Sequence, residues 1–194
     1  MSRKTEKNAR NRIVDTALDL FYRQGYLATG INQIISESQV AKATFYTHFP
    51  SKEALCIEYL RARHILWMGW LKESVENEGN SRDKLWAVFG FLKRWMIDSN
   101  FRGCAFLNIA SEVPSVETEI RNEVKKHKNE LQRFLQNIIE EIMGSNASSI
   151  GLDVPHIAKM IYVLVEGAIV ASQNYNETWP IESAQEAAKI LLML

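Results

Sequence analysis

Apolar residues recur at helical spacing along most of the chain. In the stretch RIVDTALDLFYRQGY, residues 12–26, one apolar stripe is formed by Ile13, Ala17, Leu20 and Phe21, and this period predicts a helix with one buried face. Gly25 suits the end of that helix, because glycine readily adopts the left-handed conformation of a helix cap. A second, shorter helix is predicted over residues 31–38, where three isoleucines face inward.

The next short segment, residues 42–49, continues the helical spacing. Phe45 and Phe49 are four residues apart, so they share one helix face. Pro50 cannot continue the helix, and Ser51 is a favourable N-cap for the helix after it. Three short helices within about 45 residues, the last two joined by a tight turn, are typical of a helix-turn-helix unit.

The remaining chain predicts longer helices. Their expected ranges are 52–78, 82–98, 104–112, 115–143, 153–175 and 179 to the end. There is no convincing strand pattern or internal repeat, and the loops are short, as in compact helical folds. The sequence therefore predicts an all-α fold of about nine helices, with a helix-turn-helix domain over residues 1–50 and a larger helical domain over residues 51–194.

The third predicted helix has an unusual outward face. Its polar side chains carry hydroxyl, imidazole and ammonium groups and include no acid; they are Lys42, Thr44, Tyr46, Thr47 and His48. A surface without carboxylates does not repel phosphates, and such groups can bond phosphates or base edges. The small Ala43 would let the backbone approach a duplex closely. The alternative is an ordinary polar face of a small helical bundle.

Charge is unevenly distributed along the chain. The formal net charge is zero, but residues 1–52 contain eight Lys and Arg against four Asp and Glu, a balance of +4. Residues 53–194 therefore carry −4. A basic head on an acidic body indicates an anionic partner for the head, most simply nucleic acid. A solvated basic tail would give the same asymmetry.

The stretch TGINQIISESQVAKATFYTHFPSKEAL, residues 29–55, resembles the DNA-binding region of the TetR family of bacterial transcriptional regulators. Its matching positions are Thr29, Ile34, Val40, Lys42, Thr44, Tyr46, His48, Phe49, Ser51, Lys52 and Glu53. The departures are Gln39 and Ala43, where glycine is common, and Phe45, where leucine is usual. Gln39 bears on the geometry of the turn.

This resemblance implies a cytoplasmic homodimer that binds a double-stranded DNA operator, usually as a repressor. It places the outward side chains of residues 42–48 in the major groove and on its flanking phosphates. It also places Thr29 and Lys52 on phosphates. Two recognition helices of a dimer would be about 34–36 Å apart and would read an inverted repeat.

The larger domain is rich in big apolar side chains. Most of them are explained by an ordinary core, but an excess of aromatic groups also lines ligand cavities. The resemblance implies such a cavity for a small-molecule effector, whose binding would lower operator affinity. The candidate ligand-binding residues are Trp67, Trp70, Phe89, Trp95, Phe106 and Cys104.

The segment RGCAFLN, residues 102–108, suggests a second way of regulating the protein, through a cysteine thiol. Cys104 lies two residues from Arg102, near a predicted helix start, an environment that favours a reactive thiolate. Some regulators of the TetR family, which the chain resembles, use a similar Gly-Cys segment to sense electrophiles or oxidants. The alternative is a small buried residue, as free cysteines commonly are, and Cys56 is interpreted in that way.

The last two helices carry the dimer hypothesis. One stripe of the penultimate helix is formed by Ala158, Ile161, Val165, Ala168 and Ile169. Small residues nearby permit close helix approach, and the C-terminal AAKILLML would be exposed in an isolated chain. A two-fold four-helix interface would bury both features, although an intrachain packing stripe has the same pattern.

Other classes of protein are less well supported. The four histidines have no metal-ligand spacing. There is no glycine-rich phosphate loop or GxSxG motif, so no cofactor, metal or enzymatic activity is expected. No apolar run reaches 18 residues, and no membrane span is predicted. A DNA-binding regulator controlled by a protein partner, without a small-molecule input, remains the main alternative; a helical enzyme is the weaker one.

Overall fold

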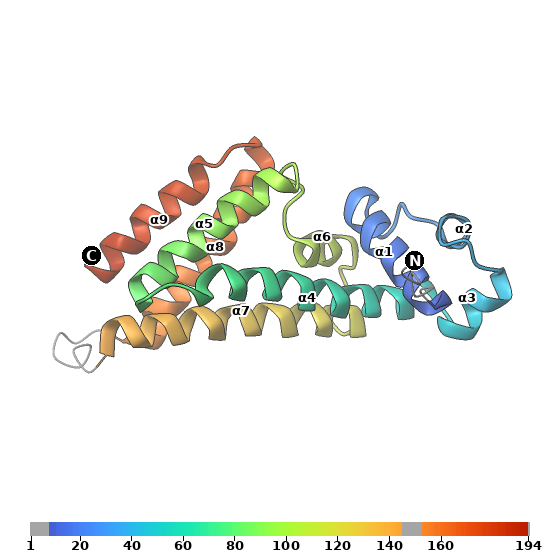
Figure 1. The fold of residues 1–194 in the computed structure, drawn as a ribbon, viewed down its shortest axis with the longest axis horizontal. Coiled ribbons are helices and arrows are strands. Elements are labelled where there is room, and N and C mark those ends of the chain that lie inside the picture. Colours follow the sequence, from blue (N-terminus) through green and yellow to red (C-terminus); the bar gives the residue numbers. More distant parts are fainter. Residues whose placement is uncertain (1–7, 145–152, 194) are drawn as a thin grey trace, which may run out of the picture. The chain divides into compact units, whose positions relative to one another are not determined.

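The computed structural model describes residues 8–144 and 153–193, and within these ranges the chain has nine helices and no strand (Figure 1). This confirms the predicted all-α fold. The helices are α1 (Ala9–Gln24), α2 (Ile31–Glu37), α3 (Lys42–His48), α4 (Lys52–Glu76), α5 (Ser81–Asp98), α6 (Ala105–Glu112), α7 (Glu119–Met143), α8 (Val154–Tyr175) and α9 (Trp179–Leu192).

The helices form two compact units. Unit 1 comprises the described residues up to Ile65 together with Ala105–Lys125, and unit 2 comprises Leu66–Cys104 together with the described residues from Lys126 onward. Helices α4 and α7 contribute residues to both. The chain thus divides differently from the predicted boundary after residue 50, because α6 and the first part of α4 belong with the helix-turn-helix.

Unit 1 is built on α1, which packs against α2 and α3. The α1 stripe predicted from the sequence is buried, as are Ile34 of α2 and Phe45 of α3. Burying an aliphatic or aromatic side chain of this size contributes about 1.5–3 kcal/mol. The side chain of Asn8 caps α1 by accepting a hydrogen bond from the Asn11 amide at 2.9 Å. These interactions orient the short helices, which could not persist alone.

The turn between α2 and α3 has the geometry of a Schellman cap. The amide of Val40 donates to the carbonyl of Ile35, and the amide of Gln39 donates to the carbonyl of Ser36. Gln39 adopts a left-handed φ of 54°, a conformation that glycine takes more readily. The guanidinium of Arg12 donates to the carbonyls of Ser38 and Gln39. The turn is therefore formed with glutamine at the glycine position and is held by α1.

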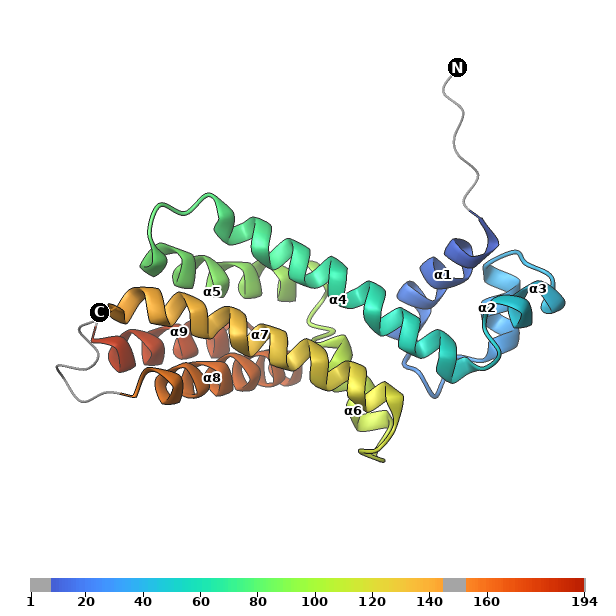
Figure 2. The same ribbon diagram turned by 90° about the horizontal axis from the view of Figure 1, so that it is seen from below.

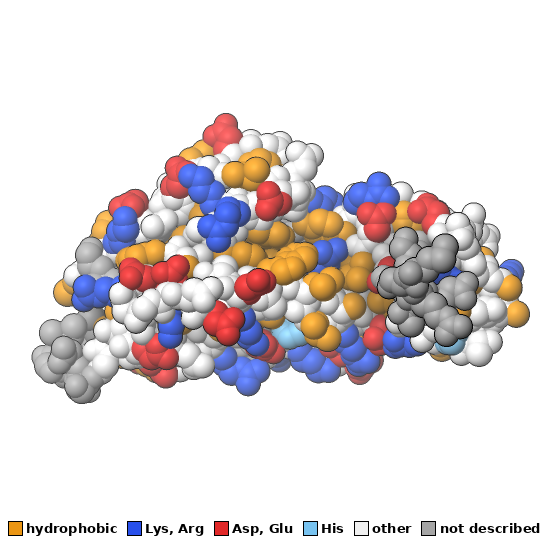
Figure 3. Space-filling model, viewed as in Figure 1, with side chains coloured by type: hydrophobic (Ala, Val, Ile, Leu, Met, Phe, Trp, Pro, Cys, Tyr) orange, Lys and Arg blue, Asp and Glu red, His pale blue; other side chains and the backbone are white. Residues whose placement is uncertain are grey.

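Unit 2 is held by packing among α5, α8 and α9. Helices α8 and α9 lie side by side in both ribbon views (Figures 1 and 2). The inner face of α5 buries Leu85, Phe89 and Leu92, and that of α9 buries Ile181 and Ala188. On the face of unit 2 in view in Figure 3, acidic and basic side chains are interspersed.

Helix α8 is the most apolar long helix among the described residues. By length and composition alone it could cross a membrane, with a mean hydropathy of 1.5 over its most apolar window. Only part of the helix is buried in the chain, yet apolar residues continue on its exposed side. A core helix that also takes part in an interface has the same composition.

Candidate nucleic-acid interface and effector region

The outward face of α3 is accessible. Lys42, Ala43, Tyr46, Thr47 and His48, termed here the α3 outer face, are exposed, and Thr44 is half-buried. Phe45 of α3, and Phe49 directly after it, are buried beneath. The helix therefore separates an apolar inner side from a polar outer side, as a recognition helix requires.

Side chains of the α3 outer face retain hydrogen-bonding capacity. The Thr47 hydroxyl donates to the Ala43 carbonyl at 2.9 Å, so its oxygen can still accept. The Tyr46 ring meets the Phe45 ring edge-on, with centroids 5.3 Å apart, while 43% of Tyr46 remains exposed. Because α3 contains no acid, the face can approach phosphates without like-charge repulsion.

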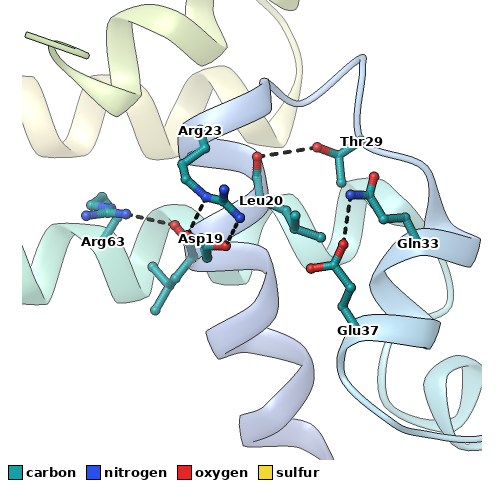
Figure 4. Close-up of polar contacts among 8 residues, drawn as sticks. Asp19, Leu20, Arg23, Thr29, Gln33, Glu37 and Arg63 are labelled. Carbon is teal, nitrogen blue, oxygen red and sulfur yellow. Dashed lines mark hydrogen bonds and ion pairs between the residues drawn. The ribbon is translucent and has the colours of Figure 1, made fainter. Parts of the chain in front are cut away.

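Thr29 does not fit the phosphate contact predicted for it. It is fully buried, and its hydroxyl donates to the Gly25 carbonyl at 2.7 Å. It also lies 3.4 Å from the Leu20 carbonyl, to which it donates (Figure 4). The Gly25 carbonyl directly follows α1, where backbone acceptors lack intrahelical partners. The Thr29 side chain thus closes the end of α1 rather than facing solvent.

Lys52, the other residue predicted on a phosphate, begins α4, and its side chain contacts the turn between α1 and α2. Its ammonium donates to the Leu27 carbonyl at 3.3 Å and lies 4.6 Å from the centre of the Tyr26 ring. Burial lowers the pKa of Lys52. An ammonium has three donors, and one of them binds the Leu27 carbonyl. The Lys52 side chain could therefore still bind a phosphate, and that contact stays a prediction.

Charged side chains stabilise α1 through contacts within the helix and with α4. Arg63 donates to the Leu18 carbonyl at 2.9 Å, and Arg23 is paired with Asp19 (Figure 4). Arg10 forms an ion pair with Glu58 at 3.0 Å. Part of the positive charge of the basic head therefore has a structural role, and the basic residues at positions 3, 4 and 7 lie outside the described residues.

Two of the predicted ligand-binding residues, Trp67 and Trp95, meet in an aromatic cluster of unit 2. The Trp67 ring lies 5.3–5.5 Å from those of Phe91, Trp95 and His127. Beside this cluster, a groove of about 490 Å³ between α4 and α5 has Trp70, Phe91 and Trp95 in its lining. The remaining lining residues of this α4–α5 groove are Glu73, Ser74, Arg94 and Asp98.

The other predicted aromatic residues lie elsewhere. Phe89 is buried in the core beside Trp86, with ring centres 6.4 Å apart. Phe106 is buried on α6, in unit 1. Neither lines the α4–α5 groove. Helical spacing does not distinguish an aromatic residue that fills a core from one that borders a groove.

Cys104 is buried beside a charged pair that sequence spacing does not indicate. The Lys128 ammonium lies 3.4 Å from the Cys104 sulfur and 2.7–2.8 Å from the two Glu166 oxygens. Burial alone would lower the pKa of Lys128, but Cys104 and Glu166 outweigh it, so that this pKa is raised. Burial raises the pKa of the Cys56 thiol to about 12, in keeping with its interpretation as structural.

The α8 stripe predicted at a dimer interface is instead buried within the chain. Ala158, Ile161, Val165, Ala168 and Ile169 are each at most 4% exposed, because α8 packs this side against α9 and α5. The exposed apolar residues of α8 are others and include Met160, Val163 and Val170. The dimer prediction therefore named the wrong face of the helix.

Comparison with known proteins matches both parts of the chain to one family. Residues 13–59 match the model described as "Bacterial regulatory proteins, tetR family". Residues 81–188, more than half of the chain, match "Tetracyclin repressor-like, C-terminal domain".

Individual relatives agree with this. The transcriptional repressor NemR of Escherichia coli K12 is 23% identical over 99% of this chain and 98% of its own length. The regulator LmrA of Bacillus subtilis is 50% identical over 52 residues, covering 26% of this chain and 28% of LmrA.

Solved structures share the fold. A TetR-family regulator from Streptomyces coelicolor superposes with a TM-score of 0.82 at 24% identity, covering 95% of this chain and 94% of that one. Reduced E. coli NemR gives 0.77 at 22% identity, covering 95% and 97%. The helix-turn-helix, its exposed acid-free face and both family matches lead to one conclusion: the chain belongs to the TetR family of bacterial regulatory proteins and is a DNA-binding transcriptional regulator.

Proposed function

We propose that this regulator is a cytoplasmic repressor that binds an inverted-repeat operator as a homodimer and is released by an effector. The observation that carries the proposal is the α3 outer face, which is exposed, acid-free and backed by buried aromatic residues. Tyr46, Thr47 and His48 would contact base edges and phosphates, and Lys42 would contact a phosphate.

The outer side of α8 and α9 supports the dimer. A groove of about 600 Å³ between these helices, here the α8–α9 groove, includes Met160, Val163, Leu164 and Leu191 in its lining. Val163 is 65% exposed and Ile190, another lining residue, is 78% exposed. An apolar surface of this kind is typical of an interface, and a second copy related by a two-fold axis would cover it with the same surface.

The α4–α5 groove is the proposed effector site. Its aromatic lining suits a flat apolar ligand, and its few charged side chains could orient a polar substituent. The ligand would weaken operator binding by binding the DNA-incompetent arrangement more tightly than the competent one.

Modification of Cys104 is a second proposed input. Its sulfur lies beside the Lys128–Glu166 pair in a buried setting. Adding a group to that sulfur would disturb the packing around a buried charge pair, which is costly to break. Treatment with an electrophile would then lower operator affinity in the wild type and not in Cys104→Ser.

Selection of bound fragments from genomic DNA tests the function directly. Wild-type protein should enrich fragments containing an inverted repeat, and candidate effectors or electrophiles should then release them. Failure to enrich any fragment at low salt would contradict DNA binding. Enrichment that only a protein partner can reverse would favour the alternative without a small-molecule input.

A further inference from the structure

Glu112, the last residue of α6, binds the turn that joins α1 to α2. Its two carboxylate oxygens accept hydrogen bonds from the backbone amides of Tyr26 and Leu27, at 3.2 and 2.6 Å. Helix α6 and the turn that it contacts both belong to unit 1. A glutamate at a helix end is most often a solvated surface group, but this one is half-buried and makes two charge-assisted hydrogen bonds.

The same turn is held by two further side chains. Lys52 of α4 donates to the Leu27 carbonyl and lies over the Tyr26 ring. Thr29 donates to the Gly25 carbonyl. The peptide segment 25–29 is therefore held by an acid from α6, a base from α4 and its own Thr29 hydroxyl, just before α2 begins at Ile31.

Two features fit the turn to the carboxylate. A Cβ atom at Gly25 would lie 3.0 Å from a Glu112 oxygen, a tight contact, and Gly25 has a left-handed φ of 99°, so glycine is favoured on both counts. Arg121 of α7 donates to the Ala110 carbonyl at 2.7 Å, which fixes the end of α6 from which Glu112 projects.

We infer that Glu112 is a positioning residue for operator binding: its carboxylate holds segment 25–29, and thereby sets the start of α2 on which α3 depends. This rests on the proposed function. Because α6 lies outside the helix-turn-helix, any displacement of α6 would be transmitted to the DNA-binding helices through these two hydrogen bonds. The DNA-competent arrangement is the one in which both are made.

The substitution Glu112→Gln tests this inference, because the predicted change in operator affinity is a decrease, opposite to the effect of the lost charge alone. A glutamine has one acceptor oxygen, so its amide group would place a donor against one of the two backbone N–H groups. Operator affinity should fall about tenfold, equivalent to about 1.4 kcal/mol. The loss of one negative charge by itself would act in the opposite direction, since it strengthens attraction to phosphates.

Glu117→Gln is the matched control, because Glu117 is exposed and the change in charge is the same. Its operator affinity should be equal to or slightly above that of the wild type. Hydrogen exchange supplies a readout without DNA: the Tyr26 and Leu27 amides should exchange at least about tenfold faster in Glu112→Gln than in Glu117→Gln.

The outcomes separate the two proposals. If the wild type binds no DNA, the proposed function fails. If the wild type binds but Glu112→Gln matches Glu117→Gln in affinity, the positioning role is overturned, whatever its thermal stability. Unchanged exchange at both amides would show that the carboxylate does not hold the turn in solution, and that result also overturns the inference.

Discussion

At the residue scale, the turn of the helix-turn-helix shows how side chain and backbone are matched. Gln39 occupies a left-handed position at the C′ site of α2, and Arg12 binds its carbonyl. The sequence showed that Gln39 departs from the family pattern, because glycine is common at this position in the TetR family. It could not indicate that the same turn forms nonetheless, since that depends on a side chain 27 residues away.

Replacing Gln39 with glycine should stabilise the protein. A non-glycine residue in the left-handed region costs about 1–2 kcal/mol, and glycine removes that cost while adding freedom to the unfolded chain. The free energy of unfolding in urea should therefore rise by about 0.5–1 kcal/mol. Gln39→Val, which is branched at Cβ, should lower it. A destabilised Gln39→Gly protein would contradict this account of the turn.

A second prediction at this scale concerns Cys56. Burial raises the pKa of its thiol from the ordinary value of 9.0 to about 12, so the folded state retains a proton that the unfolded state loses. The resulting stability is present below pH 9 and is lost as the pH rises from 9 toward 12, at a rate of at most about 1.4 kcal/mol per pH unit.

Urea unfolding of wild type and Cys56→Ala at pH 8, 9, 10 and 11 checks this. The wild type should lose stability more steeply than the variant above pH 9. Burial raises the pKa of Tyr26 to about 12, and Cys56 adds to this shift. Removing Cys56 therefore also reduces the loss of stability from Tyr26, which acts in the same direction in the comparison. Parallel curves would show that the Cys56 thiol does not titrate differently in the two states.

At the scale of elements, apolar periodicity located the helices well. The predicted start of α9 and end of α7 agree with the structure, whereas α7 begins at Glu119 rather than 115, because residues 116–118 form a turn and a bend. The choice of helix face was less accurate. Helix α8 has apolar residues on two sides, and only packing against α9 and α5 decides which side is internal.

These two sides of α8 should respond differently to a charge. Val163→Asp places a carboxylate on the exposed side and should convert the proposed dimer to monomers while the chain stays folded, since a single buried charge at an interface is strongly unfavourable. Ile161→Asp, on the fully buried side, should unfold the chain. Light scattering after size exclusion, with circular dichroism, distinguishes these results. A Val163→Asp protein that remains dimeric would place the interface elsewhere.

At the scale of the whole molecule, the family, the helical fold and the helix-turn-helix could be predicted from the sequence because they depend on local patterns. The hydrogen bonds of Glu112 and of Lys128 could not, because each joins residues at least 24 positions apart in the chain. Candidate site residues named from composition therefore divided into those that line a groove, such as Trp70, and those that fill a core, such as Phe89.

The central claim is that the α3 outer face reads a DNA groove. Its most direct test is the affinity of wild type, Tyr46→Phe and Tyr46→Ala for a selected operator, measured by fluorescence anisotropy at one fixed salt concentration. Because each tyrosine–DNA interaction is worth about 1–3 kcal/mol and a dimer carries two of them, Tyr46→Ala should bind at least about 30-fold more weakly, with unchanged helix content. Tyr46→Phe should fall between the two. Equal affinity of folded Tyr46→Ala and wild type would contradict the claim.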